Sequence, residues 1–359
     1  MRMRNLMADE RISIELRELY QQYGYLPYKV NQFEEYDLYM RNKRFLMSEN
    51  VIAFSDMDGK LMAMKPDVTL SIIKNTSDST DTTKVSYAER VYRVPRGEKG
   101  FKEIMQTGLE VIGQVDAYAM GEVLMLAARS LEIIREDYAL DLADLGIVSG
   151  ILSETGLDDA HRAQLLALIR DKNLHGLKAQ CMQLGVDERT QERLCSLVTV
   201  YGPFAQTLPI FEQMDLPESC ARALANLRSV LQMVTACGVR NINLDFSVVS
   251  DMSYYNGLVF SGFVCGVPRS VLSGGQYDYL MRRMGRRNQA MGFAVYLDQL
   301  ERLLGQTREY DVDLLIAYDQ DAAPEAALLA AQEAVGRGLS VRVQRTGDTS
   351  IRARKVMTV

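Results

Sequence analysis

Two adjacent tyrosines, Tyr254 and Tyr255, stand in the stretch SDMSYYNGLVF at residues 250–260. The apolar run after them is typical of a strand, and neighbouring residues on a strand point to opposite faces of the sheet. The pattern therefore predicts that one ring lies in the core while the other lines a cavity. A phenol hydroxyl both donates and accepts hydrogen bonds, so such a cavity suits a polar ligand.

A carboxamide and a carboxylate occupy a second stretch, FKEIMQTGLEVIG at residues 101–113, which has the composition of a strand. Gln106 and Glu110 are four residues apart, so on a strand they share one face. Arg93 lies near the end of the strand-like run before them. Two interpretations remain open at this point: the three side chains line a ligand pocket, or they form a polar network beneath a loop.

Cysteine and histidine usage argues against metal and nucleophilic sites. None of the five cysteines forms a CxxC pair, and the only two histidines, His161 and His175, lie in a helical region, so a structural zinc site is not expected. Nothing near either histidine supports a Ser-His-Asp or Cys-His arrangement. We expect the cysteines to be buried, reduced thiols.

Charge and hydropathy indicate which kinds of partner the protein has. The net charge of −6 argues against nucleic acid as the main partner, because phosphate binding favours a basic face. The basic run MRRMGRRNQ at 281–289 is either a solvated turn or a local patch for a partner or phosphate. There is no apolar run of membrane-spanning length and no secretory signal, so we expect a cytoplasmic protein without a membrane partner.

The elements that must position these residues follow from periodicity. Residues 9–23 have helical spacing and end at a glycine, and Asp58-Gly59 suits a hairpin turn between two short strands. Asp67 is the expected cap of the next helix. Further elements are expected as a long hairpin of 84–94 and 101–113, a helix at 116–137 and a strand at 143–148.

The second half changes character twice. Residues from about 149 to 236 read as an all-α insertion, after which strands resume and a final helix spans about 290–304. Residues 308–359 form a short β-α-β unit, too small to bury a core alone. The chain is thus expected to fold as an α+β core at 1–305, an antiparallel sheet flanked by helices, followed by this segment.

Five motifs follow one another along the chain. They are KPDVT (65–69), YRVPRGEKGFKEIMQTGLEVIG (92–113), SYYNGLVF (253–260), SGGQYDYL (273–280) and MGFAVYLDQLERLL (291–304). Together, and in this order, they resemble the catalytic core of class II histidyl-tRNA synthetases over residues 8–304, with the helical insertion in its usual place. The resemblance implies a class II aminoacyl-tRNA synthetase-like fold, whose C-terminal segment resembles the start of an anticodon-binding domain.

Several positions depart from the synthetase pattern. The arginine held to promote adenylation is Ser250 here, and the Glu-Arg that ends the third motif is Asp298-Gln299. A glycine that leaves room for ATP is Tyr296. The glutamate of R-x-E is missing after Arg93, and an arginine of the glycine-rich motif is Gln276. Adenylation develops charge on the phosphates of ATP, so these losses remove both binding and transition-state stabilisation.

The positions that hold histidine in the synthetases are retained. The resemblance implies that an arginine binds the carboxylate, that a carboxylate and a carboxamide bind the ammonium, and that Glu110 with a tyrosine hydroxyl brackets the imidazole. The expected histidine-binding residues are Asp67, Thr69, Arg93, Gln106, Glu110, Tyr254 and Tyr255, with Asp67 replacing a glutamate.

This combination is similar to the regulatory subunits of ATP phosphoribosyltransferase. The resemblance implies a non-catalytic subunit that needs no cofactor, activates a short-form catalytic subunit and mediates feedback inhibition by histidine in the first step of histidine biosynthesis. It also implies a homodimer or a higher hetero-oligomer, paired through about residues 9–36, although Asn31 replaces the proline typical there. The loop PRGEKG at 95–100 is the expected moving part. The alternatives are a divergent histidyl-tRNA synthetase, or a module that senses tRNA or an amino acid.

Overall fold

The chain divides into two compact units, residues 1–304 and 305–359. The computed structural model describes residues 8–46, 50–94, 99–249, 254–300, 310–319, 324–346 and 351–359. Each unit is considered by itself below. Among these residues no helix is both long and apolar enough to cross a membrane.

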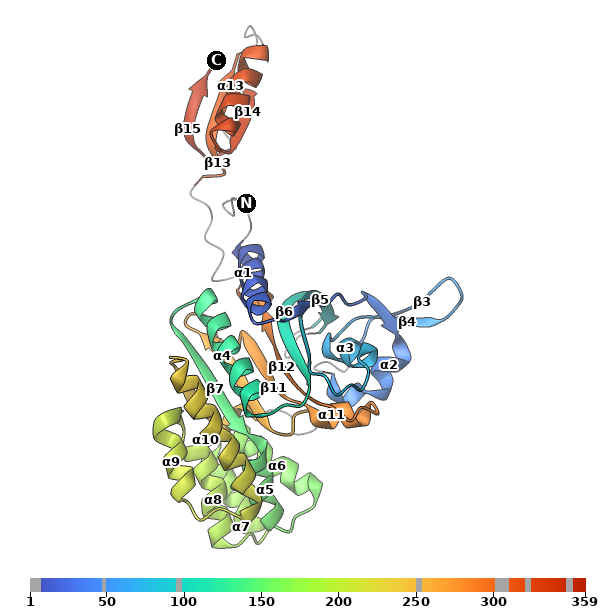
Figure 1. The fold of residues 1–359 in the computed structure, drawn as a ribbon, viewed down its shortest axis with the longest axis vertical. Coiled ribbons are helices and arrows are strands. Elements are labelled where there is room, and N and C mark those ends of the chain that lie inside the picture. Colours follow the sequence, from blue (N-terminus) through green and yellow to red (C-terminus); the bar gives the residue numbers. More distant parts are fainter. Residues whose placement is uncertain are drawn as a thin grey trace. The chain divides into compact units, whose positions relative to one another are not determined.

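A nine-stranded sheet organises the first unit, in the order β1-β5-β6-β12-β11-β10-β7-β9-β8 (Figure 1). The six strands from β5 to β7 pair antiparallel, whereas β1 beside β5 and β9 beside β7 are parallel. The strands are β1 Leu26–Pro27, β5 Thr83–Arg93, β6 Lys102–Gly113, β7 Tyr138–Asp144, β8 Gly202–Pro203, β9 Ile242–Leu244, β10 Leu258–Val264, β11 Leu272–Gln276 and β12 Gln289–Tyr296.

Strand β6 shows how the sequence separates the two faces of this sheet. Its odd residues Leu109 and Val111 are buried in the larger core, with helices α1 (Ala8–Gln22) and α4 (Ala117–Ile134). Figure 1 shows both helices lying across this face. The even residues of β6 point the other way, as the two-residue period of a strand requires. Gln106 and Glu110 are among these, which confirms that they share a face.

Smaller elements cover the opposite face. A second sheet, β2-β4-β3, joins helices α2, α3 and α11 there around a separate apolar core. The expected hairpin turn is present, with Gly59 at φ 78° between β3 and β4. These elements are β2 Phe33–Glu35, α2 Tyr36–Arg41, β3 Ala53–Ser55, β4 Leu61–Met64, α3 Thr69–Asn75 and α11 Asp278–Arg283.

The helical insertion begins earlier than expected. The prediction of a strand at 143–148 is wrong, because β7 ends at Asp144 and this residue caps a helix by accepting a hydrogen bond from Gly146 N at 2.8 Å. Acidic caps also begin α4, α6 and α8. The insertion consists of α5 Leu145–Glu154, α6 Asp159–Arg170, α7 Leu174–Gln183, α8 Glu188–Thr199, α9 Phe204–Gln213 and α10 Ala221–Ala236.

The predicted final helix at about 290–304 is also wrong over most of its described length. Residues 289–296 form β12, which pairs with β6 on one side and β11 on the other. Helical turns begin only at Leu297–Leu300, and the rest of the predicted helix lies outside the described residues. The apolar spacing fits a helix, but two flanking strands satisfy the backbone of this segment on both edges.

The second unit is the expected β-α-β segment with one more strand. β13 (Val312–Tyr318) and β14 (Val341–Arg345) are parallel and joined through α13 (Pro324–Gly336). A third strand, β15 (Ala353–Thr358), pairs parallel with β13 on its other side, and the sequence did not predict it.

Side chains at the surface differ from expectation in two places. Cys237 and Cys265 are exposed rather than buried, while Cys181 and Cys220 are buried as expected. In the basic run at 281–289, Arg286 Nη2 donates to the carbonyl oxygen of Lys74 at 2.9 Å. Part of this run is therefore used to hold the chain after α3.

Candidate functional site

All seven residues predicted from the sequence line one cavity of about 650 Å³. Three sources provide them: the turn and first residue of α3, the facing strands β5 and β6, and the segment that leads into β10. The residues are Asp67, Thr69, Arg93, Gln106, Glu110, Tyr254 and Tyr255.

Glu110 is the most enclosed acid of the cavity, at 2% exposure. Tyr277 Oη donates to its Oε2 at 2.7 Å, and Thr69 Oγ1 donates to its Oε1 at 2.8 Å. Burial raises the pKa of Glu110 to about 8, although both hydrogen bonds lower it. The carboxyl group therefore responds to a ligand: a donor or a positive charge placed beside it favours its ionised form.

Tyr277 and Gly292 belong to this arrangement, and the sequence reasoning assigned neither to the site. A side chain at Gly292 would place its Cβ 1.8 Å from Glu110 Oε2, so only glycine leaves room for the carboxylate. The available signal was their position inside the quoted motifs SGGQYDYL and MGFAVYLDQLERLL.

The paired tyrosines do not alternate across a strand as predicted. Both precede β10, which begins at Leu258, and both line the cavity with ring centroids 4.6 Å apart. Asn256 holds this segment with two hydrogen bonds. Its backbone N–H donates to Gln276 O at 3.0 Å, and its side-chain Oδ1 accepts from Tyr279 N at 3.1 Å. The segment forms a turn instead of a strand because these two hydrogen bonds replace the pairing with a neighbouring strand.

Asp67 has two roles at the start of α3. Its Oδ1 accepts a hydrogen bond from Leu70 N at 2.9 Å, which is the capping contact expected from the sequence. Burial raises its pKa, while the Leu70 amide and the charge of Arg93 lower it. The carboxylate thus stands at the cavity wall with cations near it.

Three of the positions that depart from the synthetase pattern, Tyr296, Asp298 and Gln299, also line the cavity. The guanidinium of Arg93 lies over the ring of Tyr296, 5.5 Å from its centroid, and Tyr296 Oη lies 2.6 Å from Ser273 Oγ. Ser250 and residues 95–98 of the PRGEKG loop lie outside the described residues.

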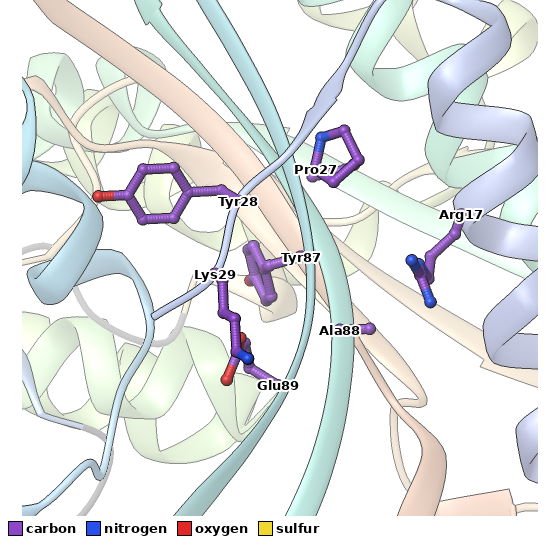
Figure 2. Close-up of a pocket in the computed structure, with 8 residues that line it drawn as sticks. Arg17, Pro27, Tyr28, Lys29, Tyr87, Ala88 and Glu89 are labelled. Atoms are coloured by element: carbon purple, nitrogen blue, oxygen red, sulfur yellow. The ribbon is translucent and has the colours of Figure 1, made fainter. Parts of the chain in front are cut away.

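A smaller cleft of about 300 Å³ opens beside β5 (Figure 2). Arg17, Tyr28, Lys29 and Glu89 contribute to its lining. Tyr87 lines both this cleft and the larger cavity, so one ring forms part of the wall between them.

Comparison with known families decides the relationship. The model of the family described as "Histidyl-tRNA synthetase" matches residues 4–300. The chain belongs to the histidyl-tRNA synthetase family. This assignment confirms the expected class II synthetase-like fold.

Two curated relatives of this chain share one name. The ATP phosphoribosyltransferase regulatory subunit of Acetivibrio thermocellus is 25% identical over 343 residues, covering 92% of this chain and 82% of that protein. The regulatory subunit of the same name from Alkaliphilus metalliredigens is 26% identical over 330 residues, covering 88% and 83%.

Solved structures of the family agree on the fold. An ATP phosphoribosyltransferase regulatory subunit/histidyl-tRNA synthetase from Bacillus halodurans superposes with a TM-score of 0.80 at 23% identity, covering 98% of this chain and 93% of that one. A histidyl-tRNA synthetase from Nostoc sp. PCC 7120 gives 0.74 at 16%, covering 96% and 85%. A chain of the ATP phosphoribosyl transferase (HisG:HisZ) complex from Thermotoga maritima gives 0.64 at 20%, covering 81% and 98%.

Proposed function

We propose that this chain is the non-catalytic regulatory subunit of an ATP phosphoribosyltransferase, and that the 650 Å³ cavity binds L-histidine. The curated names of its relatives support the regulatory role. In this role the chain activates a short-form catalytic subunit and carries the feedback signal of histidine in the first step of histidine biosynthesis, in the cytoplasm.

The observation that carries histidine as the ligand is the enclosed carboxyl group of Glu110 between Thr69 and Tyr277. An imidazole needs a partner for a ring N–H, and a carboxyl group with adjustable protonation supplies it. Arg93 on the neighbouring strand suits the ligand carboxylate, and Asp67 suits its ammonium group. These three charged groups line one cavity, so an amino acid with a basic ring satisfies all of them.

A divergent histidyl-tRNA synthetase is the competing function. Tyr296, Asp298 and Gln299 count against it, since they stand in the cavity where the synthetase pattern has a glycine, a glutamate and an arginine. In that pattern the glycine leaves room for ATP and the arginine binds its phosphates, whereas Tyr296 fills space and Gln299 carries no charge.

The test is a titration of histidine into the Glu110→Gln variant by calorimetry. The substitution keeps the size of the side chain and prevents it from ionising when histidine binds. Losing one charge-assisted hydrogen bond costs about 1.5–3 kcal/mol, so the affinity falls about 10- to 150-fold. The reconstituted complex stays active and needs correspondingly more histidine for inhibition.

The matched control is Glu122→Gln. Glu122 is also a buried glutamate, 7% exposed, and it accepts a hydrogen bond from Tyr25, but it lies on α4 across the sheet. We expect the Glu122→Gln variant to bind histidine with the wild-type affinity. If Glu110→Gln changes neither binding nor inhibition, histidine acts elsewhere in the complex.

A further inference from the structure

A buried ion pair stands directly before the cavity segment of α3. Lys65 is 0% exposed, and its Nζ lies 2.7 Å from Glu89 Oε2. Glu89 is 8% exposed, and its other oxygen, Oε1, accepts a hydrogen bond from Val30 N at 3.1 Å. Both charges are therefore removed from water and depend on each other.

The pair connects three stretches of chain. Lys65 N donates to Gln32 O at 3.0 Å, and Tyr92 N donates to Lys65 O at 2.8 Å. The backbone of Lys65 is thus fixed between the segment after β1 and the end of β5, while its side chain reaches back to β5. Two of these stretches continue into the cavity, because Asp67 follows Lys65 by two residues and Arg93 follows Tyr92.

Glu89 lines the surface cleft and stands on the same strand as two residues of the cavity, Tyr87 and Arg93. In the β5–β6 ladder it stands opposite Gln106, on the face that carries Glu110. Figure 2 shows Glu89 and Tyr87 from the side of the cleft, on the same strand. Lys65 therefore attaches the turn before α3 to the strand that forms one wall of the cavity.

Stability alone does not account for such a pair. Taking two charges out of water costs about as much as their attraction returns, and apolar replacements of buried pairs are often neutral or stabilising. What a hydrogen-bonded pair adds is a fixed geometry. The geometry fixed here is that of the residues 65–69, which carry Asp67 and Thr69.

We propose that Lys65 and Glu89 are positioning residues, which hold Asp67 where it recognises the ammonium group of the bound amino acid. The proposal rests on the proposed function, because it takes histidine as the ligand. It predicts that the pair controls recognition of the ammonium end and not of the imidazole end, where Glu110 is also held by Tyr277 from another element.

The experiment uses the double variant Lys65→Met with Glu89→Gln. Methionine keeps the length of the lysine stem, and glutamine keeps an acceptor for Val30 N. Two ligands are titrated by calorimetry: L-histidine, and imidazolepropionate, which lacks only the α-ammonium group. Urea denaturation of each variant reports whether the fold is retained.

We expect the double variant to lose about 10- to 100-fold in affinity for histidine and to bind imidazolepropionate as the wild type does. The matched control is Lys74→Met with Glu34→Gln. That pair has the same 2.7 Å contact but ties the far end of α3 to β2, so both affinities stay unchanged.

Four outcomes overturn the proposal. The first is an unchanged histidine affinity in a folded double variant. The second is an equal loss of affinity for both ligands, since a general structural defect affects both ends of the cavity. A wild-type protein that does not bind histidine overturns the proposed function as well, which separates the two failures. Should the double variant not fold, the single variant Glu89→Gln decides the question. We expect its affinity for histidine to fall about 3- to 10-fold while its affinity for imidazolepropionate is unchanged. An equal change in both affinities overturns the proposal.

Discussion

Glu110 shows how one residue is set by opposing forces. Its carboxyl group accepts bonds from Thr69 and Tyr277, which favour the ionised form, yet burial dominates and raises the pKa to about 8. Tyr254 is half-buried, and desolvation raises its pKa, so its phenol remains a neutral hydrogen-bonding group at the same wall. The cavity is thus prepared for a ligand that supplies the missing donor or charge.

The raised pKa of Glu110 predicts a pH dependence of stability. Between the ordinary pKa of 4.5 and about 8, the folded state keeps a proton that the unfolded state releases. Stability without histidine therefore falls across this window, with a limiting slope of about 1.4 kcal/mol per pH unit, and the loss is complete above pH 8. Urea denaturation of wild type and Glu110→Gln from pH 5 to 8.5 isolates this effect. Parallel profiles for the two proteins would contradict it.

Among the elements, β12 determines whether the cavity exists. In the ladder Gly292 stands opposite Glu110, and a Cβ there would also lie 2.3 Å from Leu109 O. The same strand carries Tyr296, which lies beneath the guanidinium of Arg93. One strand therefore supplies the space for the carboxylate and fills the region near the arginine.

Gly292→Ala tests this role of β12. The added methyl group meets the backbone and the Glu110 carboxylate, so the first unit loses about 1–3 kcal/mol of stability and histidine binding is lost. Calorimetric unfolding and a histidine titration measure the two effects. Gly336→Ala is the control, because a Cβ at this position meets nothing within 4 Å. We expect the stability of this variant to differ from the wild type by less than about 0.5 kcal/mol. Similar behaviour of the two variants would be inconsistent with the close approach at Gly292.

At the scale of the whole molecule, the synthetase fold is kept while the groups for nucleotide chemistry are changed. The first unit carries the cavity by itself, and the second unit has its own three-stranded sheet. Regulation then depends on assembly, since a ligand transmits a signal only when it binds one state of a complex more tightly than another.

The purified chain should not exchange pyrophosphate with ATP in the presence of histidine, nor charge tRNA. Loss of one preorganised charge contact costs about 100- to 1,000-fold in rate, and the arginine expected at Gln299 is one such contact. A histidyl-tRNA synthetase assayed in parallel gives the positive control. Robust pyrophosphate exchange by this chain would contradict the regulatory role and indicate an active synthetase.

The chain should also be at least a dimer. Leu26 and Phe33, within the segment 9–36 expected to pair, are 69% and 50% exposed in the single chain. Burial of such apolar side chains against a second copy of the chain favours association. Light scattering at micromolar concentration measures the mass, and a monomer would contradict the expectation.

The sequence by itself predicted the residues that line the larger cavity. The residues Asp67, Thr69, Arg93, Gln106 and Glu110 were found from motifs and from strand periodicity, and the structure brings them to one cavity. Local signals suffice for such residues, because alternation fixes their face and a capping acid fixes the start of a helix.

Only the tertiary structure decided the remainder. The segment 290–296 has helical spacing but becomes a strand, because β6 and β11 offer hydrogen bonds on both of its edges. Tyr254 and Tyr255 face one cavity because Asn256 bonds to distant residues. The close approach of Gly292 to Glu110 and the ion pair of Lys65 with Glu89 are contacts between residues far apart in the chain. The motifs that contain Gly292 and Lys65 mark these positions but do not reveal their contacts.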